Sequence, residues 1–217
     1  MDRRALLALF GSGLIAPHVM AGAQERPTND ALSLNIAVWG DSLTDLYQWN
    51  LSRLYGTKRQ VFNGGVPGET SQQIRQRMVA DRAHAHWICV FWYGHNNFVK
   101  AEVNPDIVRS VAALAPGNHR FIVMPMLSWA TDGRKGSPMY DQVVRAGAEL
   151  GALYPHNYLD IRAHLLRSYD RNSAQDMQDV QSGITPSSLR FDAIHLNTAG
   201  CNTVAARVAE FIVKNGW

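Results

Sequence analysis

Five short apolar stretches recur in the first three quarters of the chain, each bounded by glycine, proline or polar residues. Short, bounded stretches of this kind are typical of strands buried in a sheet. They cover residues 34–39, 60–62, 86–93, 119–126 and 157–161.

Longer segments with helical spacing of their apolar residues lie between and after these stretches. The clearest cover residues 70–82, 105–115, 139–154 and 197–215. Strands that alternate with helices form βαβ units, whose right-handed crossovers build a parallel sheet covered on both faces. We therefore predict an α/β fold: a three-layer α/β/α sandwich around a five-stranded, mostly parallel, flavodoxin-like sheet.

The first 23 residues have the layout of a secretory signal peptide. Arg3-Arg4 precede an apolar run, and the small residues Ala21-Gly22-Ala23 follow it. We predict cleavage near Gln24 and export to the periplasm or the exterior, by either the Sec or the Tat route. A membrane anchor is the alternative, but the run is broken by Pro17 and is shorter than the roughly 20 residues of a spanning helix. We therefore expect no stable membrane insertion after cleavage.

Residues 24–217 have the composition of one globular domain. Hydrophobic residues make up 46% of the chain and charged residues 18%, and we find no repeat or low-complexity stretch beyond residue 30. Loss of the signal peptide would change the formal net charge from +3 to about +2. Such a small, evenly spread charge does not favour nucleic acid or an anionic membrane surface as a partner.

The two cysteines, Cys89 and Cys201, lie in apolar segments without the spacing of metal ligands. We interpret both as buried packing residues. Because an oxidising compartment would permit a disulfide between them, that pairing stays open.

Polar residues that could take part in catalysis or binding follow the predicted strands. In parallel α/β sheets, ligands bind outside the carboxyl ends of the strands. Three polar segments come directly after strands, and a fourth precedes the last helix: residues 40–45, 63–70, 94–97 and 192–195.

These segments hold candidates for acyl transfer, which needs a nucleophile, a base, a group that orients the base, and donors for an oxyanion. Ser42 begins a predicted helix, where its hydroxyl can face a cleft; alternatively, Ser42 or Asp41 is only a helix N-cap. Asp192 and His195 are close enough in sequence for the carboxylate to orient the imidazole. An isolated pair of this kind would more often be a surface aspartate beside a histidine near a helix start.

The order of the segments resembles that of the GDSL/SGNH hydrolase family over nearly the whole mature chain. Gly40-Asp41-Ser42-Leu43 matches the block of the nucleophile, and Asp192-x-x-His195 matches the last block. Gly68 and Asn96 match the glycine and the asparagine of the two blocks between them. The resemblance implies Ser42, His195 and Asp192 as the catalytic residues, and the Ser42 N–H, Gly68 and Asn96 as the oxyanion hole. It also implies hydrolysis of acyl esters without a metal or an organic cofactor.

Asn97 departs from the family's pattern, which usually has aspartate at this position. The thioesterase and lysophospholipase members tend to keep that aspartate, so their substrates do not carry over. His95, Asn97 and Trp129 are the candidates for contacts with substrate, although a loop histidine is more often only solvated. Other aromatic side chains near strand ends, Trp39, Trp92 and Tyr93, could contact substrate or pack in the core.

The substrate is expected to be a small-molecule or glycan ester. An exported esterase without a lipase-like apolar lid is consistent with O-deacetylation of a carbohydrate, by analogy at the level of the fold. Lipid or thioester substrates are the alternative, and a non-catalytic glycan-binding domain is a further one. The long polar segment of residues 169–190 leads to Asp192, and we expect it to border or cover the active site.

Overall fold

A computed structural model describes residues 32–98 and 101–217 of the protein, so the predicted signal peptide lies outside the described residues. Four parallel strands form one sheet in the order β2-β1-β3-β4. The strands are β1 (Ile36–Gly40), β2 (Val61–Gly65), β3 (Ile88–Trp92) and β4 (Phe121–Val123). The helices are α1 (Ser42–Tyr55), α2 (Ser71–Ala80), α3 (Val103–Ala112), α4 (Pro138–Leu153), α5 (Ile161–Arg167), α6 (Ala174–Gln181) and α7 (Thr198–Lys214), with one 3₁₀ turn, η1 (Ser187–Leu189).

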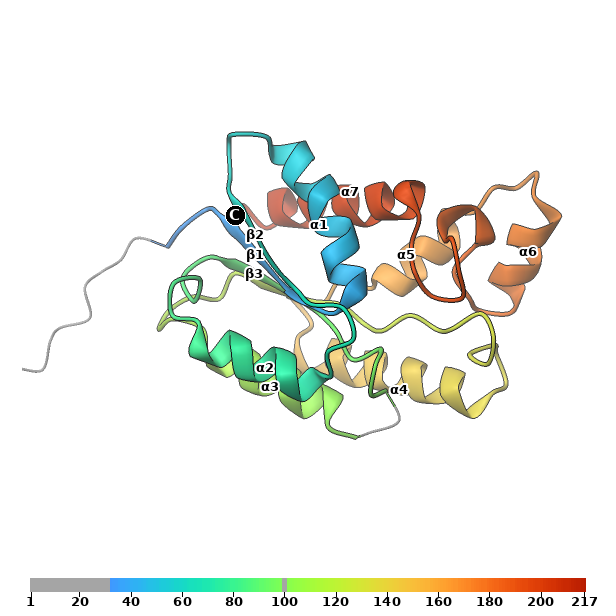
Figure 1. Cartoon of the computed structure of the whole chain (residues 1–217), viewed down its shortest axis with the longest axis horizontal. Helices are drawn as coiled ribbons and strands as arrows, with labels where there is room; N and C mark the ends of the chain where they lie inside the picture. Colours follow the sequence, from blue (N-terminus) through green and yellow to red (C-terminus); the bar gives the residue numbers. More distant parts are fainter. Residues whose placement is uncertain (1–31, 99–100) are drawn as a thin grey trace, which may run out of the picture. The chain divides into compact units, whose positions relative to one another are not determined.

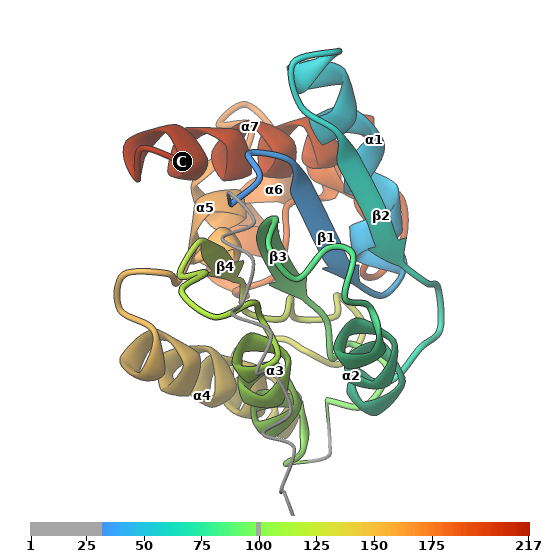
Figure 2. The ribbon, with the colours of Figure 1, turned by 90° about the vertical axis from the view of Figure 1, so that its left-hand side faces the viewer.

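Two apolar clusters, one on each face of the sheet, hold the helices in place. Along β3, Val90 and Trp92 belong to the cluster shared with α1, α5 and α7, whereas Cys89 and Phe91 belong to the cluster shared with α2, α3 and α4. A strand covered on both faces is apolar at every position, which explains the unbroken apolar runs in the sequence. Figures 1 and 2 show the two helical layers on either side of the sheet. The predicted three-layer α/β/α architecture is confirmed.

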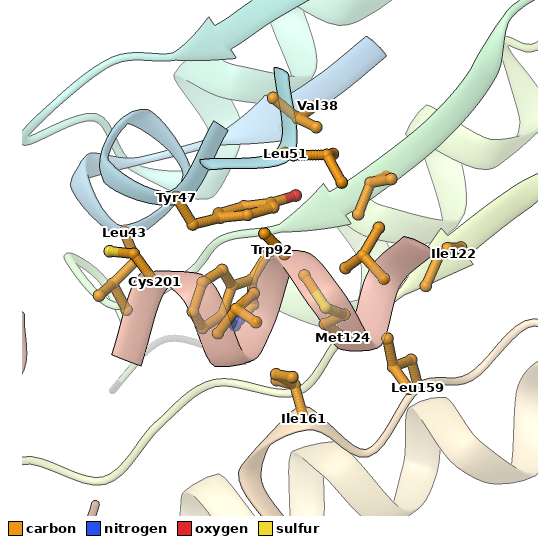
Figure 3. Close-up of a cluster of buried hydrophobic side chains, with 14 of the residues drawn as sticks. Val38, Leu43, Tyr47, Leu51, Trp92, Ile122, Met124, Leu159, Ile161 and Cys201 are labelled. Atoms are coloured by element: carbon orange, nitrogen blue, oxygen red, sulfur yellow. The ribbon is translucent and has the colours of Figure 1, made fainter. Parts of the chain in front are cut away.

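The larger cluster packs α1 against α7. Figure 3 shows Leu43 and Tyr47 of α1, Trp92 of β3 and Cys201 of α7 within it. The rings of Tyr47 and Trp92 meet edge to face, with their centroids 5.6 Å apart. Because α1 begins at Ser42 and α7 follows the 192–195 segment, this packing brings together the two ends of the predicted site.

The prediction of a fifth strand was wrong. Residues 157–161 pair with β4 through a single bridge at Val123, whose N–H donates to Asn157 O at 2.9 Å and whose carbonyl accepts from Leu159 N at 3.0 Å. The next donor in a parallel ladder would be the N–H of residue 125, and Pro125 has none. The chain then enters α5, so the sheet has four strands.

The polar segment of residues 169–190 contains α6 and η1 and is not a simple loop. Two of its side chains, Asp176 and Asp179, are fully buried. Helical periodicity was weak in the sequence because carboxylates, and not apolar residues, anchor α6 to the rest of the chain.

Cys89 and Cys201 are free and buried, and they belong to clusters on opposite faces of the sheet. Burial raises the pKa of Cys89 to about 12 and that of Cys201 to about 11. Their interpretation as packing residues is confirmed. Within the described ranges, no helix is both long enough and apolar enough to cross a membrane.

Candidate active site

Ser42 is the first residue of α1, two residues after the end of β1. Asp41 is the N-cap, and its Oδ1 accepts from the N–H of Leu43 at 3.2 Å. The hydroxyl of Ser42 is therefore not needed for capping and instead lies 2.9 Å from Nε2 of His195. Gly40 makes this turn possible, because a Cβ there would collide with the carbonyl of Trp92 and the side chain of Thr44.

Asp192 and His195 lie on the loop between η1 and α7. Nδ1 of His195 is 2.7 Å from Asp192 Oδ2, and Asp192 Oδ1 accepts from the N–H groups of Ile194 at 2.8 Å and His195 at 2.7 Å. Burial raises the pKa of Asp192, but these hydrogen bonds outweigh that effect and hold it below its ordinary value. The ionised carboxylate favours a proton on Nδ1, which leaves Nε2 as the acceptor that faces Ser42.

The two remaining oxyanion candidates lie on the loops after β2 and β3. Gly68 has a φ of +83°, a left-handed conformation that favours glycine. Asn96 is exposed, and its Nδ2 donates to the carbonyl of Glu69 at 2.9 Å, which ties the two loops together. Since an amide carries two protons, Asn96 keeps one for a ligand. Among the described residues, no acceptor is found for the backbone N–H of Ser42 or Gly68.

Arg77 of α2 stabilises the loop that carries Gly68 through hydrogen bonds at both ends of the loop. Its Nε donates to the Glu69 carboxylate at 2.8 Å, and its Nη2 donates to the carbonyl of Gly64 at 2.9 Å. Sequence reasoning did not identify Arg77, because its contacts with Glu69 and Gly64 exist only in the folded chain.

His95 lies inside the protein, with 4% of its surface exposed. Its Nδ1 lies 3.0 Å from Asp41 Oδ2, and its Nε2 accepts from the N–H of Leu127 at 2.9 Å. Because a backbone N–H can only donate, the ring proton lies on Nδ1 and points at Asp41. His95 thus connects the turn of Ser42 with the loop of Asn96, and we do not propose it as a contact with substrate.

Asn97 is also buried and faces α2. Its Oδ1 accepts from the N–H of Ser71 at 3.0 Å, and its Nδ2 donates to the hydroxyl of Ser71 at 2.9 Å. That hydroxyl donates in turn to Asp106 at 2.7 Å. Both ends of the Asn97 amide are occupied by the protein, so this residue too is not proposed as a contact with substrate.

Trp129 is partly buried against the larger apolar cluster. The N–H of its neighbour Ala130 donates to the carbonyl of Ala193 at 2.8 Å, so the loop of Trp129 borders the loop of His195. The other aromatic candidates are at most 2% exposed and belong to the core: Trp39, Trp92 and Tyr93.

Arg190, which sequence reasoning missed, links α6 to the loop of His195. Its guanidinium donates to the carbonyl of Asp192 at 2.9 Å, to the carbonyl of Thr185 at 2.9 Å and to Asp179 Oδ2 at 3.0 Å. Residues 169–190 therefore border the candidate site, as expected, and hold the backbone of Asp192 through Arg190.

Comparison of the sequence with known proteins finds a relative over part of the chain. No protein-family model matches the chain. A stretch of 147 residues is 26% identical to the tail spike protein of Salmonella phage epsilon15, and it covers 62% of this chain but only 14% of that protein.

Solved structures match over a larger share of the chain. A GDSL-like lipase from Bacteroides thetaiotaomicron superposes with a TM-score of 0.65 at 12% identity, over 84% of this chain and 89% of that one. An acetyl xylan esterase superposes with a TM-score of 0.65 at 16% identity, over 81% of this chain and 98% of that one. The protein has the GDSL/SGNH hydrolase fold. In this fold the carboxyl ends of β1, β2 and β3 lead to Ser42, Gly68 and Asn96.

Among residues 32–98 and 101–217, no group of three or more His, Cys, Asp or Glu side chains could hold a metal ion. The arrangement of Ser42, His195 and Asp192 is suited to proton transfer from a hydroxyl.

Proposed function

We propose that the protein is a serine esterase that hydrolyses acyl esters through an acyl-enzyme. The observation that carries this proposal is one chain of hydrogen bonds. Ser42 Oγ lies 2.9 Å from His195 Nε2, and His195 Nδ1 lies 2.7 Å from Asp192 Oδ2. A hydroxyl, an imidazole and an ionised carboxylate in this order form a proton-transfer unit that activates the hydroxyl.

In the first half of the reaction, Ser42 Oγ attacks the carbonyl carbon of the ester while His195 Nε2 takes the hydroxyl proton. The carbonyl oxygen becomes an oxyanion, and the N–H groups of Ser42 and Gly68 and the amide of Asn96 stabilise it. The oxyanion then re-forms the carbonyl, the bond between the carbonyl carbon and the alcohol oxygen breaks, and His195 gives its proton to that oxygen, so the alcohol leaves and Ser42 keeps the acyl group.

In the second half, a water molecule attacks the acyl group on Ser42. His195 takes the proton of the water, and the tetrahedral intermediate collapses to release the carboxylic acid. The proton on His195 returns to Ser42 Oγ. Asp192 stays ionised throughout and stabilises the imidazolium that forms in each half.

The substrate that we favour is an O-acetylated carbohydrate. Similarity to an acetyl xylan esterase and the predicted export of the chain support this choice. A lipid or thioester substrate is the alternative, supported by the similarity to a GDSL-like lipase. A non-catalytic glycan-binding domain is less favoured, because no member of the proton-transfer unit is missing.

The test is hydrolysis of p-nitrophenyl acetate, butyrate and longer esters by the full chain and by Ser42→Ala. We expect activity that falls by at least about three orders of magnitude in the variant. Ser52→Ala, on the same helix, is the control and should keep full activity. Equal rates for the wild type and Ser42→Ala would eliminate Ser42 as the nucleophile.

A further inference from the structure

A cavity of about 310 Å³ lies between α1, the start of α7 and the loop that precedes it. Its lining includes Phe191 and Leu196, which flank His195 in the sequence, but neither His195 nor Ser42 itself. Its size is at the lower end of the range for small-molecule sites. Its lining includes Leu46, Asn50, Phe191, Leu196, Thr198 and Cys201.

Phe191 forms one wall of this cavity and is 64% exposed, although it is a large apolar side chain. Its ring stacks on the imidazole of His195, with centroids 5.6 Å apart and an angle of 11° between the planes. The backbone of Phe191 is held next to that of His195, because the N–H of Phe191 donates to the carbonyl of His195 at 3.0 Å and Arg190 forms an antiparallel bridge with Leu196. The structure thus presents an exposed aromatic ring stacked on the proposed base.

The cavity lies toward a different layer of the sandwich from two of the three oxyanion donors, Gly68 and Asn96. The loops of Gly68 and Asn96 lead to α2 and α3, and Asn97 bonds to the first residue of α2. The cavity is instead formed by α1 and α7, which cover the other face of the sheet. Leu46 lies one helical turn after Ser42 and so continues the face of α1 that carries the hydroxyl.

The chemistry decides which half of an ester would occupy this cavity. The carbonyl oxygen must face the oxyanion donors, whereas the alcohol oxygen must face His195, which gives it a proton as it leaves. The alcohol half therefore extends on the His195 side, past the ring of Phe191.

We propose that this cavity binds the alcohol half of the ester and that this half is a sugar ring. A sugar has apolar C–H faces, which Phe191 and Leu46 can cover, and hydroxyl groups at its rim. Two polar groups of the cavity can meet these hydroxyls. Asn50 uses its Nδ2 to bond Asn202 at 2.6 Å, so its carbonyl oxygen remains an acceptor, and no partner for the hydroxyl of Thr198 is found among the described residues.

This inference rests on the proposed esterase function, and its test compares two acetates that differ only in the alcohol. The probes are ethyl acetate and a mono-acetylated methyl xyloside. We expect Phe191→Ala to lower the ratio of kcat/KM for the acetylated xyloside to kcat/KM for ethyl acetate by roughly tenfold, mainly through a higher KM for the xyloside. Trp49→Ala is the matched control, because Trp49 is an exposed aromatic residue of α1 outside the cavity lining, and it should alter neither substrate.

A second variant separates binding from support of His195. Leu46→Trp should fill the cavity without removing the ring of Phe191, and it should again lower activity on the xyloside selectively. If Phe191→Ala lowers kcat equally for both acetates, Phe191 only positions His195 and the inference is overturned. It is also overturned if neither variant discriminates between the alcohols. If the wild type hydrolyses ethyl acetate no faster than Ser42→Ala does, the proposed function itself is contradicted.

Discussion

At the scale of single residues, Asn97 supplies a proton that an aspartate could not. The hydroxyl of Ser71 has one proton and gives it to the buried Asp106, so it must accept from its other neighbour. The amide of Asn97 is that donor. Asparagine in place of the usual aspartate at position 97 therefore has a local physical reason. That reason lies in the contacts of Asn97 with α2 and is not visible in the sequence.

We predict that Asn97→Asp lowers the free energy of unfolding at pH 7 by about 1–3 kcal/mol, the usual cost of an unsatisfied buried polar contact. A carboxylate at this position would face the lone pairs of Ser71 Oγ in a buried site. The loss should shrink as the pH falls, because a protonated carboxyl group can donate. Urea unfolding at several pH values measures this effect. A loss that does not depend on pH would contradict the explanation.

Asn96, one residue earlier, is predicted to affect rate and not stability. Removal of its amide by Asn96→Ala should lower kcat by on the order of 10²–10³, the usual effect of losing one oxyanion donor. KM and the unfolding midpoint should change little, because the side chain is exposed and makes one hydrogen bond to Glu69. Steady-state kinetics on p-nitrophenyl acetate tests this prediction. Unchanged turnover would remove Asn96 from the mechanism.

At the scale of elements, the apolar pattern identified the four strands and the longer helices with an apolar face, but it missed the short helices α5 and α6. The helices α2, α3, α4 and α7 and the four strands overlap the predicted segments. In contrast, α6 is anchored by Asp176 and Asp179, and the fifth strand is lost because Pro125 cannot extend a ladder. Polar anchors and missing donors leave no periodic signal in the sequence.

The ion pair between Arg190 and Asp179 is predicted to support the loop of His195 as one unit. Asp179 is fully buried, so Arg190→Met leaves a buried charge without its partner and should cost about 3–5 kcal/mol of stability. The double variant Arg190→Met with Asp179→Asn should lose less than Arg190→Met alone, because the uncompensated charge is gone. Urea unfolding of the wild type, both single variants and the double variant measures this coupling. Additive losses would show that the pair does not act together.

At the scale of the whole molecule, the site joins segments that are distant in sequence. Ser42 and His195 are 153 positions apart, and the packing of α1 on α7 brings them to hydrogen-bonding distance. The order of the motifs was enough to nominate Ser42, Asp192 and His195, which the fold brings within hydrogen-bonding distance of one another. It could not nominate Arg77, Arg190 or Phe191, because their importance lies in contacts that exist only in the folded chain.

We predict that Asp176 contributes to the decrease in the free energy of unfolding at low pH. Burial raises the pKa of this carboxyl, but hydrogen bonds from Ser188, Asp170 and Ser187 outweigh that effect and lower it below the ordinary value. The carboxylate therefore contributes stability at pH values above its ordinary pKa of about 4, and this contribution is lost as the pH falls through the lowered pKa. Asp176→Asn should lower stability at neutral pH and flatten its decrease in acid. Unfolding free energies with the same pH slope as the wild type would contradict this account.

The most direct test of the central claim is to label the folded full chain with an alkyl fluorophosphonate and to map the adduct by peptide mass spectrometry. Such a reagent phosphonylates a serine whose hydroxyl is activated by a neighbouring base. We predict one adduct, on Ser42, that is absent from Ser42→Ala and forms much more slowly in His195→Ala. An adduct on another residue, or no adduct on the folded wild-type protein, would contradict the assignment of Ser42 as an activated nucleophile.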